Sequence, residues 1–179
     1  MALTATIYNF DIDLSDSDRG VYETLSLRVA QHPSESDEYL IARILAYLLE
    51  YGEGIEFSRG VSDPDEPMIA IRDLTGKIQS WIDIGTPDGA RLHKASKTGA
   101  RVAVYCHKEG AQWLKGLAAA DIHRADALQL FAIDRALIGD MVSRLDRRMN
   151  FAVSIADREL YISIGDVNLT GRVERLSLS

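Results

Sequence analysis

The strongest constraint on the fold is a stretch in the middle of the chain, residues 64–97. Two apolar, β-branched runs at 68–73 and 78–85 flank a turn that contains Gly76, and this arrangement is typical of a β-hairpin. Threonine, proline and aspartate then follow at 86–88. They form a helix-start signature, with threonine as cap, proline in the first turn and an acid beside the positive helix end. The stretch therefore predicts strand, turn, strand and helix.

The same kinds of pattern predict elements on both sides of this stretch. Alternation with a period of two predicts paired strands at 3–13 and 21–30. Apolar residues at helical spacing predict a helix that Ser34 opens, with Asp37 three residues on, and that Gly52 ends. Further along, the patterns predict strands at 55–60, 101–107, 127–133 and 167–176, helices at 110–120 and 136–149, and a hairpin at 150–164.

These elements indicate the α/β class, with a mixed central sheet flanked by helices. From 34 to 107 the predicted order is helix, three strands, helix and strand. The 179 residues are enough for one domain, 1–179, with a proper core. No apolar run is long enough for a membrane span, and the N-terminus has no secretory pattern, so we expect a cytoplasmic protein without membrane contact. The oligomeric state is not predicted.

The charge of the chain is acidic overall and basic in one place. A net charge of −7 argues against nucleic-acid binding through a broad basic surface. It does not exclude a nuclease, because part of the negative charge could belong to metal ligands. Residues 91–108 contain no Asp or Glu, and their cations are Arg91, Lys94, Lys97, Arg101 and Lys108. A local basic face therefore exists within an acidic total.

Two aspartates of the central stretch are the first candidates for chemistry. Asp65 precedes the first strand of the hairpin and Asp83 lies near the end of the second. Antiparallel pairing brings such residues towards the same end, where two carboxylates could hold Mg²⁺ and the cations of the next helix a phosphate. The alternative is structural: Asp65 in a loop, Asp83 paired with a cation, and a solvated basic face. Spacing alone favours that alternative.

Other reactive side chains show no such pattern. The single cysteine, Cys106, lies in an apolar run, which is typical of an inert buried thiol, and one cysteine cannot form an intramolecular disulfide. Ser34 and Ser58 lack a nucleophile elbow, and no glycine loop of a phosphate-binding kind is present. The four histidines have no metal-ligand spacing, so each is expected to be exposed or satisfied: His32, His93, His107 and His123.

Several segments resemble the YaeQ family, and the resemblance runs from the first strand to the C-terminus. They are Gln-His-Pro-Ser-Glu at 31–35, Glu-Phe-Ser-Arg-Gly at 56–60, Asp-Glu-Pro at 65–67, and Trp-Ile-Asp-Ile-Gly-Thr-Pro-Asp at 81–88, together with Arg91 and Lys94. The resemblance implies a variant of the PD-(D/E)XK nuclease-like, or restriction-endonuclease-like, fold. Its core would cover about 34–107, with extra strands at the N- and C-termini.

The resemblance also implies a site. Asp65 would stand for the PD element and Asp83 for the (D/E) element, whereas Gly85 occupies the position where a lysine is expected. Lysines relocated to the following helix occur in that superfamily, so Lys94 would replace the missing one. Arg91, three residues earlier on the same helical face, would grip a phosphate oxygen.

The superfamily also places an acid on the helix that opens near residue 34. Glu35 and Glu38 share a face of its first turn, so either could join the site, and Glu38 is taken as the third metal ligand. The alternative is that acids at a helix start simply complement the dipole.

Two functions remain open. The first is a nuclease or phosphodiesterase acting on nucleic acid with Mg²⁺ or Mn²⁺ on Asp65, Asp83 and Glu38. The second is a binding or regulatory module on the same fold without turnover, which Gly85 favours. For either, Lys94 Nζ is expected between Asp65 and Asp83 with Arg91 at the rim, and Lys97 is the substitute.

Overall fold

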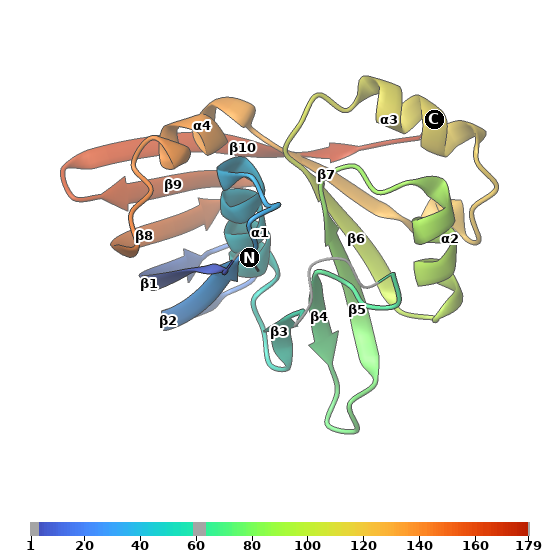
Figure 1. Ribbon diagram of the computed structural model, residues 1–179, viewed down its shortest axis with the longest axis horizontal. Coiled ribbons are helices and arrows are strands. Elements are labelled where there is room, and N and C mark those ends of the chain that lie inside the picture. Colours follow the sequence, from blue (N-terminus) through green and yellow to red (C-terminus); the bar gives the residue numbers. More distant parts are fainter. Residues whose placement is uncertain (1–3, 59–63, 179) are drawn as a thin grey trace.

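A single mixed sheet contains all ten strands found in the described part of the chain, residues 4–58 and 64–178 of the computed structural model (Figure 1). The strands are β1 (Thr6–Asp16), β2 (Val21–Gln31), β3 (Ile55–Phe57), β4 (Ile69–Arg72), β5 (Ile78–Ile84), β6 (Arg101–Cys106), β7 (Gln129–Ile133), β8 (Arg148–Ala156), β9 (Glu159–Ile164) and β10 (Val167–Leu176). The helices are α1 (Asp37–Glu50), α2 (Gly89–Lys97), α3 (Ala111–Ala119) and α4 (Arg135–Val142), with a short 3-10 helix at Ala125–Ala127. The expected α/β class with a mixed sheet and flanking helices is confirmed.

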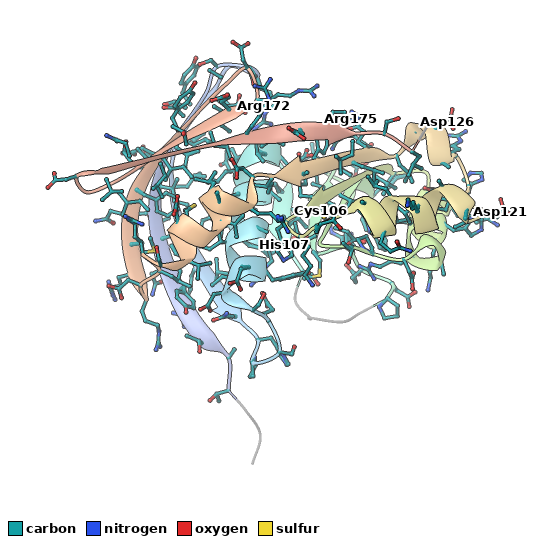
Figure 2. All side chains as sticks on the ribbon, turned by 90° about the horizontal axis from the view of Figure 1, so that it is seen from above. Cys106, His107, Asp121, Asp126, Arg172 and Arg175 are labelled. Atoms are coloured by element: carbon teal, nitrogen blue, oxygen red, sulfur yellow. The ribbon has the colours of Figure 1, made fainter. Side chains whose placement is uncertain are left out.

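The strand order is β2-β1-β8-β9-β10-β7-β6-β5-β4-β3, and the sheet bends into two halves that β10 joins (Figure 1). The first part of β10 pairs with β9 and its last four residues, Val173 to Leu176, pair with β7. Arg172 and Arg175 mark this long strand in Figure 2. Near the junction a Cβ on Gly171 would lie 2.7 Å from Leu137 of α4. Glycine therefore lets α4 pack directly on the backbone of β10.

Helices cover the two faces of the sheet unequally. α1 lies in the concavity between the halves, and its buried residues Leu40, Ile44 and Leu48 recur every four positions, as a core-facing helix requires (Figure 1). α4 adds to the same core, whereas α2 and α3 pack on the opposite face of the β5–β7 half. In β5, Ile82 points to the α1 core and Trp81 to the α2 side, so this strand is covered on both faces.

The central stretch forms the predicted hairpin. β4 and β5 pair antiparallel with Ile69 opposite Ile82, and Gly76 in the turn has a φ of 88°, a conformation that glycine adopts without strain. Three strands, β3 to β5, lie between residues 55 and 84 as expected, and β5, β6 and β7 then run parallel. The predicted strand at 55–60 ends at Phe57, and its positions 59 and 60 lie outside the described residues.

Two helix starts were predicted too early, each because a different residue forms the cap. Ser36 accepts a hydrogen bond from the Tyr39 backbone N at 3.1 Å and opens α1, whereas the Ser34 hydroxyl contacts the His32 ring at 2.7 Å. Asp88 accepts one from the Arg91 backbone N at 2.9 Å and opens α2, so Thr86 lies before the helix. A cap must place its oxygen on a donor two or three residues on, and only the three-dimensional course of the chain shows which one does.

The helix predicted at 136–149 was wrong at its end. α4 stops at Val142, and β8 begins at Arg148 because it pairs in parallel with β1, with Asn9 opposite Arg148. This long-range pairing outweighs the local helical pattern. None of the helices in the described ranges is long and apolar enough to cross a membrane.

A buried ionic network fixes α1 on the sheet. Glu50, in the last turn of α1, accepts hydrogen bonds from Arg101 (Nη2 to Oε1 2.7 Å, Nη1 to Oε2 3.0 Å) and from the Tyr105 hydroxyl at 2.7 Å. Both partners belong to β6. The network therefore anchors the end of α1 opposite to Tyr39.

We expect Glu50→Ala to lower the free energy of unfolding by about 3 kcal/mol, because it leaves buried donors without an acceptor. The estimate sits at the lower end of the usual range because the Arg101 side chain is 33% exposed. The control is Glu159→Ala, whose partner Arg172 is 61% exposed, and which should cost less than about 1 kcal/mol. Urea unfolding measures both, and equal losses would contradict the structural role given to Glu50.

Candidate functional site

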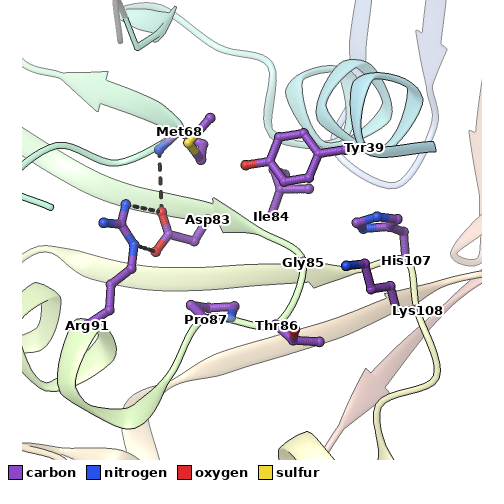
Figure 3. Close-up of a pocket in the computed structure, with 10 residues that line it drawn as sticks. All are labelled: Tyr39, Met68, Asp83, Ile84, Gly85, Thr86, Pro87, Arg91, His107 and Lys108. Carbon is purple, nitrogen blue, oxygen red and sulfur yellow. Dashed lines mark hydrogen bonds and ion pairs between the residues drawn. The ribbon is translucent and has the colours of Figure 1, made fainter. Parts of the chain in front are cut away.

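A pocket opens where the parallel strands β5 and β6 end (Figure 3). Ligands of open α/β sheets commonly bind outside the carboxyl ends of parallel strands. The pocket encloses about 260 Å³, and apolar walls from Met68, Ile84 and Pro87 carry a few polar groups between them. Those with ionisable side chains are Tyr39 from α1, Asp83 from β5, Arg91 from α2, and His107 and Lys108 after β6.

Asp83 and Arg91 form the tightest contact of the pocket. The Asp83 carboxylate is only 1% exposed, and Arg91 donates to both of its oxygens, from Nε to Oδ2 at 2.7 Å and from Nη2 to Oδ1 at 3.0 Å (Figure 3). Such bidentate, charge-assisted pairs are among the strongest polar contacts in proteins. The hydrogen bond to Asp83 raises the pKa of Arg91, which stays charged. The guanidinium also lies over the Trp81 ring, 5.5 Å from its centroid.

The second aspartate, Asp65, is paired with Lys94. This ion pair lies near the surface, where the side chains of Lys94 and Asp65 are 57% and 67% exposed. Lys94 therefore reaches one of its two expected carboxylates, and Arg91 reaches the other. The expected place of Arg91 at the rim was wrong, because the first turn of α2 begins beside the end of β5 and Arg91 extends straight onto Asp83. α2 thus supplies one cation to each aspartate.

The helix acids do not join this pair. Glu35 is buried against Arg43, with 3.1 Å between Oε2 and Nη2, so it belongs to the packing of α1. Glu38 is exposed in the first turn of α1. Across residues 4–58 and 64–178, no three His, Cys, Asp or Glu side chains come close enough to hold a metal ion. The predicted set of Asp65, Asp83 and Glu38 is therefore not brought together as a metal site.

The backbone conformation at position 85 explains why glycine stands there and not the expected lysine. Its φ is 92°, in the region that residues with side chains rarely adopt, and its N donates to the Tyr105 carbonyl at 2.9 Å. Space is not the obstacle, since the nearest atoms to an added Cβ, on His107 and Tyr39, would be 3.8 Å away. The backbone turn between β5 and α2 therefore requires glycine, and a lysine here would be strained.

His107 is the residue that the sequence reasoning missed. It was expected to be exposed or satisfied, yet it is only 5% exposed, and neither ring nitrogen has a hydrogen-bond partner in the part of the chain that the structure describes. Burial lowers the pKa of His107 to about 4, and the positive charge of Lys108 adds to this effect. The ring is therefore neutral at pH 7. It meets the Tyr39 ring edge to face, with centroids 5.8 Å apart.

A weak signal in the sequence could have identified His107 as a buried residue. His107 continues the alternation that points Ala103 and Tyr105 towards the α1 core, so it was predictable as an inward-facing residue at the carboxyl end of a buried strand. Figure 2 shows Cys106 and His107 inside the molecule, well away from Asp121 and Asp126 at its end. Tyr39 lines the same pocket as His107. Burial raises the pKa of its hydroxyl to about 12, so the hydroxyl stays protonated.

The two ion pairs of α2 differ in burial, which a double-mutant cycle can measure. We expect a coupling of about 2–3 kcal/mol between Asp83→Asn and Arg91→Gln, because that pair is desolvated and bidentate. The exposed pair, tested with Asp65→Asn and Lys94→Gln, is the matched control and should couple by less than about 1 kcal/mol. Urea unfolding of the seven proteins in these cycles, with wild type shared, supplies both values. Similar couplings would show that burial of Asp83 does not strengthen its pair.

The neutral state of His107 predicts a component of acid sensitivity. Between pH 6.5 and about 4 an unfolded chain binds a proton at this ring that the folded chain does not, so stability present above pH 6.5 is lost as the pH falls. The loss approaches about 3 kcal/mol. His107→Leu should flatten this part of the stability curve, whereas His123→Leu, at an exposed histidine, should leave it unchanged. Urea unfolding across this pH range checks it, and equal slopes in all three proteins would contradict it.

Comparison with known proteins gives one consistent result. Residues 1–173 match the family described as "YaeQ protein". Two relatives that carry the name "Uncharacterized protein YaeQ" cover 94% of this chain and are covered to 94% themselves; the one from Escherichia coli (strain K12) is 32% identical and the one from Salmonella typhi 31%.

Solved structures agree with the sequence relatives. The crystal structure of YaeQ protein from Xanthomonas axonopodis pv. citri superposes with a TM-score of 0.87 at 36% identity, over 96% of this chain and 98% of that one. The YaeQ protein from Pseudomonas syringae gives a TM-score of 0.86 at 27% identity, over 97% and 96% of the two chains. On both sequence and structure, this chain belongs to the YaeQ protein family.

Proposed function

We propose that this chain is a binding module on a nuclease-like fold, and that its ligand occupies the pocket at the ends of β5 and β6. The observation that carries the proposal is the state of Asp83, whose two carboxylate oxygens are both engaged by Arg91. A carboxylate held in this way supports the walls of a pocket. Pockets with apolar walls and a few convergent polar groups are the usual sites of small ligands.

The donor set does not fit Mg²⁺ or Mn²⁺ as it stands. Mg²⁺ requires oxygen ligands in near-octahedral geometry, and both aspartates, Asp65 and Asp83, already lie against a cation of α2. An ion on Asp83 would displace Arg91 and would then lie beside its positive charge, which is unfavourable in a buried site. Glu38 does not complete the set in the described residues. We therefore assign no catalytic step to a metal.

A metal-dependent nuclease acting on nucleic acid is the second candidate, and two observations favour it. The order α1, β3, β4, β5, α2, β6 is the core order that the PD-(D/E)XK resemblance implies. Lys94 also extends from α2 onto Asp65, as a relocated lysine would. In this hypothesis Asp65, Asp83 and Glu38 would hold the ion and Lys94 would act at the phosphate. It requires Arg91 to leave Asp83.

Divalent ions separate the two candidates. If the chain is a binding module, neither Mg²⁺ nor Mn²⁺ should raise the Tm, and metal-loaded protein should cut neither single- nor double-stranded DNA or RNA. Asp83→Asn should then lower stability, because the neutral amide leaves Arg91 without its anionic partner. Asp121→Asn, an exposed acid at the far end of the molecule, is the control for general metal effects.

The contrary outcome is equally sharp. Cleavage that needs the metal, stops in chelator and is lost in Asp83→Asn but retained in Asp121→Asn would establish the nuclease. A rise in Tm with Mn²⁺ that depends on Asp83 would also overturn the assignment of Asp83 to the pocket wall.

A further inference from the structure

We infer that the His107 end of this pocket binds a small organic anion that carries a second hydrogen-bonding group beside its charge. The inference rests on the proposed function, because it names the ligand class of the same pocket. Three features of the described residues carry it: an unsatisfied buried ring, an excess of positive charge, and a limited volume.

The first feature is the buried ring of His107. His107 is more than nine-tenths buried, lines the pocket, and has no hydrogen-bond partner for Nδ1 or Nε2 within residues 4–58 and 64–178 (Figure 3). Buried polar atoms in folded proteins almost always have partners, so such a pair of nitrogens indicates a ligand or bound water. A neutral imidazole presents one donor and one acceptor. A hydroxyl or amide on the ligand can satisfy both needs. Tyr39 lines the same pocket, with its hydroxyl pointing towards Met68 (Figure 3).

The charge of the lining selects an anion. Arg91 and Asp83 neutralise each other, whereas Lys108 forms no ion pair with any residue that the structure describes. Glu38 acts on His107 through space but does not line the pocket. One positive charge therefore remains at the mouth of a mostly apolar pocket, where it attracts a carboxylate or a phosphate ester.

The volume limits the size of this anion. About 260 Å³ is several times the ~30 Å³ that one water occupies in the liquid, and it lies just below the range of drug-sized sites. A compact hydroxy acid or sugar-like phosphate has the right size, with its carbon atoms against Met68, Ile84 and Pro87.

Four probes that share one small skeleton test the inference. Glycerate and glycerol phosphate carry an anion beside hydroxyl groups, glycerol has only the hydroxyls, and inorganic phosphate has only the charge. Binding is followed by NMR of the ¹⁵N-labelled histidine rings in the full chain. We expect both hydroxy anions to shift the His107 resonances and to bind at least about tenfold more tightly than glycerol or inorganic phosphate. The relative strength of glycerate and glycerol phosphate distinguishes a carboxylate site from a phosphate site.

Matched variants locate the site, and their binding is followed by backbone amide NMR because one of them lacks the His107 ring. His107→Leu and Lys108→Met should each weaken binding of the better probe about tenfold, whereas His123→Leu and Lys115→Met, the same changes at exposed positions outside the pocket, should not. Lys108 is exposed, so its variant tests the site even if His107→Leu fails to fold.

Three results would overturn the inference: no probe shifts His107, glycerol binds as tightly as the anions, or Lys108→Met binds as wild type does. The first would mean that His107 meets only ordered water. The proposed function fails on a different measurement, metal-dependent cleavage, so the two failures can be told apart.

Discussion

The pairing of Asp83 with Arg91 is the interaction on which the site depends. A carboxylate at the buried end of β5 is costly unless its charge is matched, and Arg91 matches it with two hydrogen bonds while its guanidinium lies over Trp81. The pair thereby fixes the first turn of α2 against the sheet and closes one side of the pocket. It also supports the proposed binding function over the nuclease, because a carboxylate engaged by arginine supports a cavity wall better than it supports a divalent ion.

Much of the fold was predictable from local pattern. The alternation of apolar residues gave the paired strands β1 and β2, and Gly76 marked the turn between β4 and β5, whose positive φ favours glycine. Strand order was not predictable, because nothing local to the N-terminal hairpin indicates that β8 lies beside it. The predicted end of α4 was wrong for the same reason, since the pairing of Asn9 with Arg148 overrides the helical spacing there.

The candidate site was predictable only in part. Periodicity and resemblance placed Asp65, Asp83, Arg91 and Lys94 near one another, and the structure pairs them two by two. Which cation meets which acid depends on the start of α2, and that start was misjudged. His107 was overlooked because no histidine has ligand spacing in the sequence. Its burial results from the fold around it: the first turn of α1 lies near the end of β6, where Tyr39 packs on a ring that the alternation of β6 already points inwards.

The parallel pairing of β1 with β8 has a consequence for how the chain is made. These strands come from opposite ends of the sequence, so during synthesis the hairpin of β1 and β2 waits with one edge open until β8 leaves the ribosome. Phe10, Ile12 and Leu14 lie on the apolar face of that edge strand, and in the folded protein Phe10 packs against Phe151 of β8. Open edges with such faces are prone to pair with other chains. The nascent polypeptide is thus most vulnerable to aggregation after its first strands have formed and before its last third has been translated.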